Sequence, residues 1–141
     1  MLQGNWTYRS YLNDTALVGN DANKALNMIF GEGVFNFVPQ EATLYRGTLD
    51  MGSGFKLTLR AVEMLPSTKG APTEVSIVGL GIDGTPTAGW QYDYRGVFAY
   101  KWPEGVKQVR TFTGTVIRVK AHGPKSPAGF TASFVAIAQG S

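Results

Sequence analysis

The feature of this chain that most constrains its fold is an alternation of apolar and polar residues with a period of two. The alternation runs through most of the chain in pieces of about 8–14 residues, separated by residues typical of turns. A period of two places successive side chains on opposite faces of a β-strand, so that one face can be buried. The pattern predicts eight strands, at residues 4–11, 28–38, 42–51, 54–64, 73–83, 88–102, 107–120 and 129–139.

Glycine recurs inside the expected strands, for example at Gly33, Gly47, Gly96 and Gly114. Because glycine weakens a strand, it usually marks a bend, a bulge or a close approach of two backbones. Its repetition indicates a strongly curled sheet. With eight strands and short turns, this favours an all-β fold, in which residues 1–141 form a single eight-stranded up-and-down antiparallel barrel. A β-sandwich or jelly roll is the competing fold, but it requires longer crossovers.

One connection, at residues 12–27, is long and poor in strand residues. Asn20 and Asp21 are suited to cap a short helix over residues 22–26. Long loops in compact domains are often functional. We therefore consider two alternatives, that the segment covers one mouth of the barrel or that it is a plain surface excursion.

The composition excludes several kinds of site. The 141 residues include no cysteine and one histidine, His122. A disulfide framework, a thiolate zinc site, an iron–sulfur cluster, a cysteine nucleophile and a multi-histidine metal centre are thereby excluded. We expect no metal and no cofactor. His122 lies in a turn, where we expect it to bond backbone or water; a general base or a haem ligand is the alternative.

The charge pattern predicts neither a nucleic-acid nor a membrane partner. The formal net charge is +3, and the basic residues beyond position 100 are scattered without a run of like charge. The N-terminal residues lack the basic and apolar regions of a signal peptide. No stretch approaches the ~18 apolar residues of a membrane helix. We therefore expect a cytoplasmic protein.

The side chains that face the interior are predicted from the position of charges, because an unpaired buried charge is costly. In 88–102, Asp93 and Arg95 mark the outer face, so the aromatic stripe from Trp90 to Trp102 points inward. In 107–120, Arg118 is taken to mark the outside in the same way. The hydroxyl-bearing and aromatic residues that these assignments place inside predict a small polar pocket with aromatic walls. The candidate ligand-binding residues are Tyr8, Ser10, Trp90, Tyr92, Tyr94, Thr111, Thr113 and Thr115.

The same assignment leaves apolar residues on the outer face of the last two strands. These residues are Phe112, Val116, Val135 and Ile137. Strands that are neighbours in a meander place such residues in one patch, and an apolar patch usually marks a protein interface. We expect a homo-oligomer, a dimer or larger.

The opening Gly4-Asn5-Trp6, a Gly-x-Trp on the first strand of an eight-stranded meander, resembles the start of the calycin barrels, the lipocalins and the avidin/streptavidin group. The resemblance implies that Trp6 packs at the closed end of the barrel. Biotin binding does not carry over, because Tyr8 and Leu12 stand where avidins have the Asn and Ser that bind the ureido oxygen. Transport of a hydrophobic ligand, as in lipocalins, fits the barrel but not a threonine-rich interior.

The chain also resembles a set of bacterial proteins of this size, and this resemblance implies no activity. The matching segments are Trp90-Gln91-Tyr92-Asp93-Tyr94, Trp102-Pro103-Glu104-Gly105, Gly114-Thr115-Val116-Ile117-Arg118, His122, Pro127-Ala128-Gly129 and Ala132-Ser133-Phe134.

Three functions remain open at this point. The first is a barrel that binds a small molecule in its interior, and the second is a filled barrel that acts as a structural or oligomerisation module. The third is an enzyme acting at the barrel mouth. The ionisable candidates for that third function are Glu32, Asp50, Glu63, Asp93 and His122, and the sequence singles out no catalytic residue.

Overall fold

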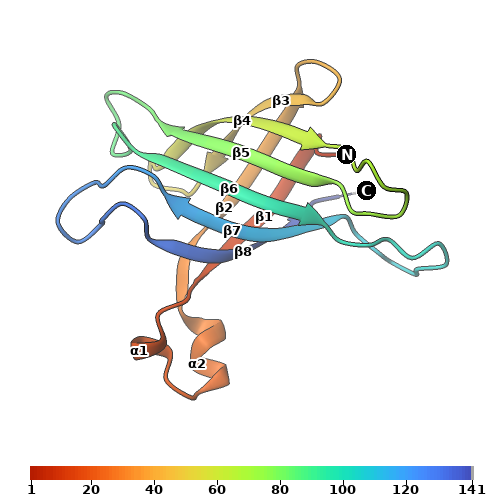
Figure 1. The fold of residues 1–141 in the computed structure, drawn as a ribbon. Coiled ribbons are helices and arrows are strands. Elements are labelled where there is room, and N and C mark those ends of the chain that lie inside the picture. The colour runs from red at the N-terminus through yellow and green to blue at the C-terminus, as the bar shows by residue number, and fades with distance from the viewer. Residues whose placement is uncertain (141) are drawn as a thin grey trace.

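The computed structural model describes residues 1–140 and shows a closed antiparallel barrel of eight strands (Figure 1). Each strand pairs with the next along the chain, and β1 pairs with β8 to close the sheet. The up-and-down barrel predicted from the sequence is thus confirmed. The strands are β1 (Gly4–Leu12), β2 (Ile29–Pro39), β3 (Leu44–Asp50), β4 (Lys56–Met64), β5 (Glu74–Gly81), β6 (Gln91–Phe98), β7 (Thr111–Arg118) and β8 (Thr131–Ala138).

Glycines allow the sheet to curl where two backbones approach closely. A Cβ at Gly47 in β3 would lie 1.7 Å from the carbonyl oxygen of Asn36 in β2. A Cβ at Gly114 in β7 would lie 1.8 Å from the carbonyl oxygen of Arg95 in β6. No side chain fits at such distances, so glycine at these positions permits the strong bend that closes the barrel.

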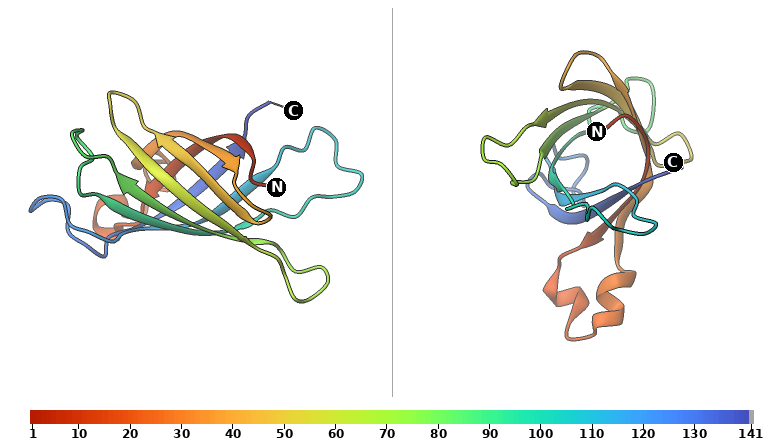
Figure 2. Two further views of the ribbon diagram at one scale, coloured as in Figure 1. Left: turned by 90° about the horizontal axis from the view of Figure 1, so that it is seen from above. Right: turned by 90° about the vertical axis from the view of Figure 1, so that its right-hand side faces the viewer.

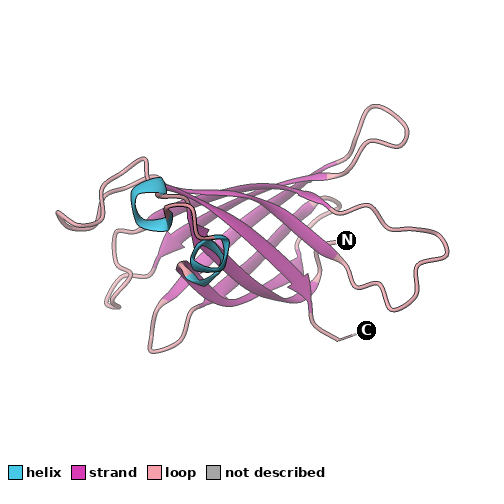
Figure 3. Cartoon of the chain, turned by 90° about the horizontal axis from the view of Figure 1, so that it is seen from below, coloured by secondary structure: helices cyan, strands magenta, loops and turns pink. Residues whose placement is uncertain are grey.

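The connection between β1 and β2 extends away from the barrel. It holds two short helices, α1 (Thr15–Val18) and α2 (Ala22–Asn27), whose first turns are capped by the side chains of Asp14 and Asp21. Neither helix buries a residue, and the pair projects from one end of the barrel (Figures 2 and 3). Of the two alternatives for this segment, the structure shows the surface excursion.

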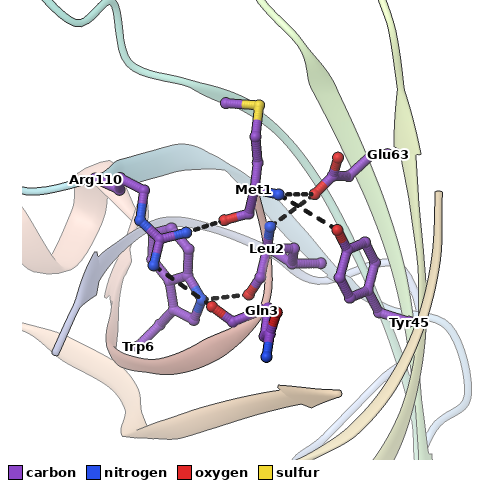
Figure 4. Close-up of polar contacts among 7 residues, drawn as sticks. All are labelled: Met1, Leu2, Gln3, Trp6, Tyr45, Glu63 and Arg110. Atoms are coloured by element: carbon purple, nitrogen blue, oxygen red, sulfur yellow. Dashed lines mark hydrogen bonds and ion pairs between the residues drawn. The ribbon is translucent and has the colours of Figure 1, made fainter. Parts of the chain in front are cut away.

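The end of the barrel that carries the N-terminus is closed by the first residues of the chain (Figure 4). The indole nitrogen of Trp6 donates to the carbonyl oxygen of Leu2 at 2.7 Å, and the Leu2 amide donates to buried Glu63 at 2.7 Å. Arg110 donates to the carbonyl oxygens of Met1 and Gln3, and its guanidinium lies 5.0 Å from the centre of the Trp6 ring. Trp6 is fully buried at this end, where the resemblance to calycin barrels placed it.

Aromatic side chains fill the middle of the barrel. Trp6 meets Phe112 edge-on with ring centres 4.9 Å apart, and Phe35 stacks on Phe112 at 6.0 Å. Tyr8 meets Phe35 at 4.8 Å and Tyr94 at 5.8 Å. This packing fills the middle of the barrel, and the interior cavity described below lies beyond it, toward the opposite mouth.

The structure corrects the predicted face of one strand. In β7 the buried residues are Phe112, Val116 and Arg118, and the side chains of Thr113 and Thr115 are exposed. The prediction that Thr111, Thr113 and Thr115 point into the barrel is therefore wrong. It failed because the charge of Arg118 was taken to mark the outer face, whereas this arginine is buried.

The correction also changes the outer surface. Phe112 and Val116 belong to the core, so the expected oligomerisation patch loses two of its four members. Val135 is half-buried and Ile137 is exposed, as expected for the outer face of β8. β6 ends at Phe98, earlier than predicted, so Tyr100 and Trp102 lie exposed in the following loop rather than inside.

Candidate functional site

A cavity of about 450 Å³ opens at the mouth opposite the closed end. It is bounded by the start of β2, β4 and β6, by the ends of β3 and β7, and by the loop that follows β7. Its volume lies within the range of small-molecule sites in proteins. The lining residues are Tyr8, Ile29, Phe30, Gly31, Glu32, Met51, Phe55, Trp90, Tyr92, Tyr94, Arg118 and His122.

Four of the residues predicted from the sequence meet here: Tyr8, Trp90, Tyr92 and Tyr94. Ser10 is fully buried beside the cavity, where its hydroxyl donates to the carbonyl oxygen of Gly31 at 3.2 Å. Thr111, Thr113 and Thr115 do not take part, because they lie on the outside of β7. The cavity contains the predicted aromatic residues but not the predicted threonines.

The hydroxyls of Tyr8 and Tyr94 lie at the floor of the cavity. Burial raises the pKa of both phenols. The Tyr8 hydroxyl also lies near the hydroxyls of Ser10 and Tyr94, whose hydrogen bonding lowers the pKa of Tyr8, whereas the proximity of Tyr8 raises the pKa of Tyr94 further. The two phenols therefore interact with each other at the floor of the cavity, where each tyrosine is only 2% exposed.

Arg118 is the unexpected member of the site. Its side chain is 7% exposed, and its guanidinium carbon lies 5.4 Å from the centre of the Phe30 ring and 5.3 Å from that of Phe130. Within residues 1–140, no carboxylate lies within ion-pair distance of it; the ion pairs formed there involve Arg9, Lys56 and the N-terminus. A buried cation without an acidic partner is unusual, because its desolvation is not offset by an opposite charge.

Hydrogen bonds hold the Arg118 guanidinium in place. Nε donates to the hydroxyl of Tyr92 at 2.9 Å, and Nη1 donates to the carbonyl oxygen of Pro127 at 3.1 Å. The third nitrogen, Nη2, forms no hydrogen bond to any described residue. Since no enclosed polar atom of the described chain is unpaired, Nη2 keeps open space beside it. This nitrogen is the free donor of the site.

The Tyr92 hydroxyl links Arg118 to His122 through hydrogen bonds. The Tyr92 hydroxyl accepts from Arg118 and lies 2.7 Å from Nε2 of His122. A neutral His122 ring with its proton on Nδ1 accepts the Tyr92 proton in this bond. Burial and the nearby charge of Arg118 lower the pKa of His122, which agrees with this neutral form.

Flat rings form the walls of the cavity. The His122 ring stacks on the Trp90 ring with centres 4.1 Å apart and planes 14° from parallel. The ring of Phe55 is tilted against Trp90, with ring centres 5.8 Å apart. Glu32 borders the cavity, but its carboxylate pairs with Arg9 at 3.1 Å and is exposed. The site thus combines apolar walls with one free cationic donor and the paired hydroxyls of Tyr8 and Tyr94.

Sequence reasoning missed Arg118 and Phe30 and gave His122 a different environment. A signal for Arg118 was present, because Phe112 and Val116 share its face and are apolar, whereas Thr113 and Thr115 on the other face are polar. The prediction relied on the charge of Arg118 and not on this alternation of apolar and polar residues. The ring of His122 bonds Tyr92 and stacks on Trp90, and only its backbone amide bonds the loop backbone, at Ser126.

Comparison with protein-family models, with curated proteins and with solved structures finds no match for this chain. The function must therefore be argued from the site. In the part of the chain that the structure describes, no group of three or more histidine, aspartate or glutamate side chains gathers closely enough to hold a metal ion. No helix among these residues has the length and apolarity needed to cross a membrane.

Proposed function

We propose that this protein binds a small organic molecule in the mouth of its barrel. The observation that carries the proposal is the cavity of about 450 Å³, which is lined by aromatic rings and by the buried Arg118, whose Nη2 has no hydrogen-bond partner among the described residues. Apolar walls with a few converging polar groups are the usual composition of a ligand site. A barrel that served only as a structural module would gain stability from filling this space.

Gly31 provides a direct test. It lies on the cavity wall, and a Cβ there would meet only the hydroxyl oxygen of Ser10 at 3.4 Å and a ring carbon of Tyr8 at 3.8 Å, which are ordinary contacts. Its backbone is not in the left-handed region, so a larger side chain is tolerated. Gly31→Leu therefore places an isobutyl group in the cavity without straining the strand, and Gly31→Ala is the matched control.

The probe is the neutral dye N-phenyl-1-naphthylamine, whose emission rises in apolar sites. We expect saturable binding to the wild type and to Gly31→Ala, and an affinity reduced by about tenfold or more in Gly31→Leu, because about four heavy atoms occupy the space the dye needs. Native mass spectrometry of the protein as purified would identify a resident molecule. Dye binding that is equal in all three proteins, or absent from a folded wild type, would overturn the proposal.

A further inference from the structure

We infer that the molecule taken by the mouth cavity is a flat organic carboxylate, whose acid group binds the free Nη2 of Arg118. The inference rests on the proposed function and names the chemical class of its ligand. It depends on three features of the site, which are the uncompensated charge, the single free donor nitrogen and the ring-lined walls.

The buried charge of Arg118 favours an anionic ligand. The Arg118 side chain is only 7% exposed, and no described carboxylate neutralises its charge. Neighbouring rings from Phe30, Tyr92 and Phe130 stabilise a cation weakly, and they do not replace an opposite charge. An oxyanion seated in the cavity would offset the desolvation of the guanidinium and would itself be bound in a medium of low dielectric constant.

The hydrogen bonds of Arg118 favour a carboxylate over a phosphate. Nε and Nη1 each donate one bond, to Tyr92 and Pro127, so the Nε–Nη2 side of the guanidinium cannot hold an oxyanion through two nitrogens. One N–H of Nη1 and the two of Nη2 remain, and Nη2 is the one nitrogen without a bond to a described residue, which suits a singly charged acid group. A phosphate monoester, with about two charges and three oxygens, usually needs several donors. His122 adds no positive charge, because it is neutral and its Nε2 already accepts from Tyr92.

The aromatic rings that line the cavity favour a flat ligand. The stacked pair of Trp90 and His122, with Phe55 next to Trp90, forms one wall of planar surfaces, and Phe30 contributes another ring. Aromatic ligands stack on such surfaces more favourably than flexible chains, which lose rotational freedom on binding. The hydroxyls of Tyr8 and Tyr94, which interact with each other, are the polar groups at the floor of the cavity.

The experiment compares 2-naphthoate with 2-naphthamide, which share a shape and differ in charge, and adds 1-naphthyl phosphate. Binding to the wild type and to Arg118→Met is measured by calorimetry, with the neutral dye of the previous section as a competitor. We expect the wild type to bind naphthoate about tenfold or more tightly than the amide and than the phosphate. In Arg118→Met the preference for the acid should disappear while the amide still binds.

Each other result has a definite meaning. Equal binding of acid and amide by the wild type, or a preference that survives in Arg118→Met, overturns the inference and leaves the proposed function standing. Tighter binding of the phosphate overturns the choice of carboxylate. Binding of neither naphthyl compound, when the dye still occupies the cavity, also overturns the inference, whereas loss of dye binding as well overturns the proposed function. If Arg118→Met does not fold, the wild-type comparison of acid and amide decides the matter alone.

Discussion

Replacing Arg118 by methionine should make the ligand-free barrel more stable. Methionine has nearly the length of arginine and remains beside the stacked rings of Phe30 and Phe130, where its sulfur makes favourable aromatic contacts. The change removes a buried cation that no described carboxylate neutralises. Such a charge costs several kcal/mol in effective desolvation, and well-packed apolar replacements of buried ions are often stabilising.

The magnitude follows from the bonds that are lost. Arg118 donates to the Tyr92 hydroxyl and to the Pro127 carbonyl, and a hydrogen bond from a charged group contributes about 1.5–3 kcal/mol. The loss is softened because Tyr92 keeps its bond to His122 and because the Pro127 carbonyl lies where water can reach it. Relief of desolvation exceeds this loss, so we expect a gain of about 1–2 kcal/mol in the free energy of unfolding, or about 3–6 °C in Tm.

The assay is urea unfolding followed by tryptophan fluorescence and far-UV circular dichroism, on protein shown to carry no ligand. Arg110→Met is the control. Arg110 is exposed at the closed end, where it donates to the Met1 and Gln3 carbonyls and lies over Trp6, so its loss should lower stability by about 1 kcal/mol. A fall of 1 kcal/mol or more in Arg118→Met would refute the reasoning, because its bonds would then outweigh the cost of burying its charge.

Two further predictions concern His122 and the glycines. The pKa of His122 is lowered in the folded state, so the unfolded chain binds more protons as the pH falls through about 6.5, and the free energy of unfolding should decrease there. His122→Gln should lose this component when urea midpoints at pH ~7.5 and ~5.5 are compared, and an unchanged pH dependence would contradict the buried neutral form. Gly31→Ala should change stability by less than about 0.5 kcal/mol, whereas Gly47→Ala should cost more than about 2 kcal/mol, because its Cβ would collide with the Asn36 carbonyl. Equal losses in the two glycine variants, measured by thermal unfolding, would refute the assignment of Gly47 to a close backbone approach.

Much of the fold was predictable because its determinants are local. The period-two alternation in β4, where Leu57, Leu59 and Ala61 are buried between exposed neighbours, needs only the geometry of one strand. The inward stripe of Tyr92 and Tyr94 in β6 was predictable for the same reason. Bends at Gly47 and Gly114 were also visible, since an internal glycine in a strand has few other uses.

The end of β6 was less predictable, because alternation continues beyond the point where the partner strand stops. Tyr100 and Trp102 continue the aromatic pattern, yet pairing with β7 reaches only to Phe98 and Phe112. A strand ends where its neighbour ceases to offer hydrogen bonds, and this depends on the register of the whole sheet. The sequence of β6 alone does not contain that information.

The sequence by itself determined the class of fold, the curl of the sheet and the aromatic interior, all of which follow from side-chain periodicity and from glycine. The tertiary structure alone decided on which side of β7 Arg118 lies. A lone charge normally faces water, and burial becomes tolerable here only through groups distant in the chain, among them the Tyr92 hydroxyl, the Pro127 carbonyl and the ring of Phe30. Those groups come together only when the barrel closes. They make Arg118, which was predicted to face outward, the main polar group of the site.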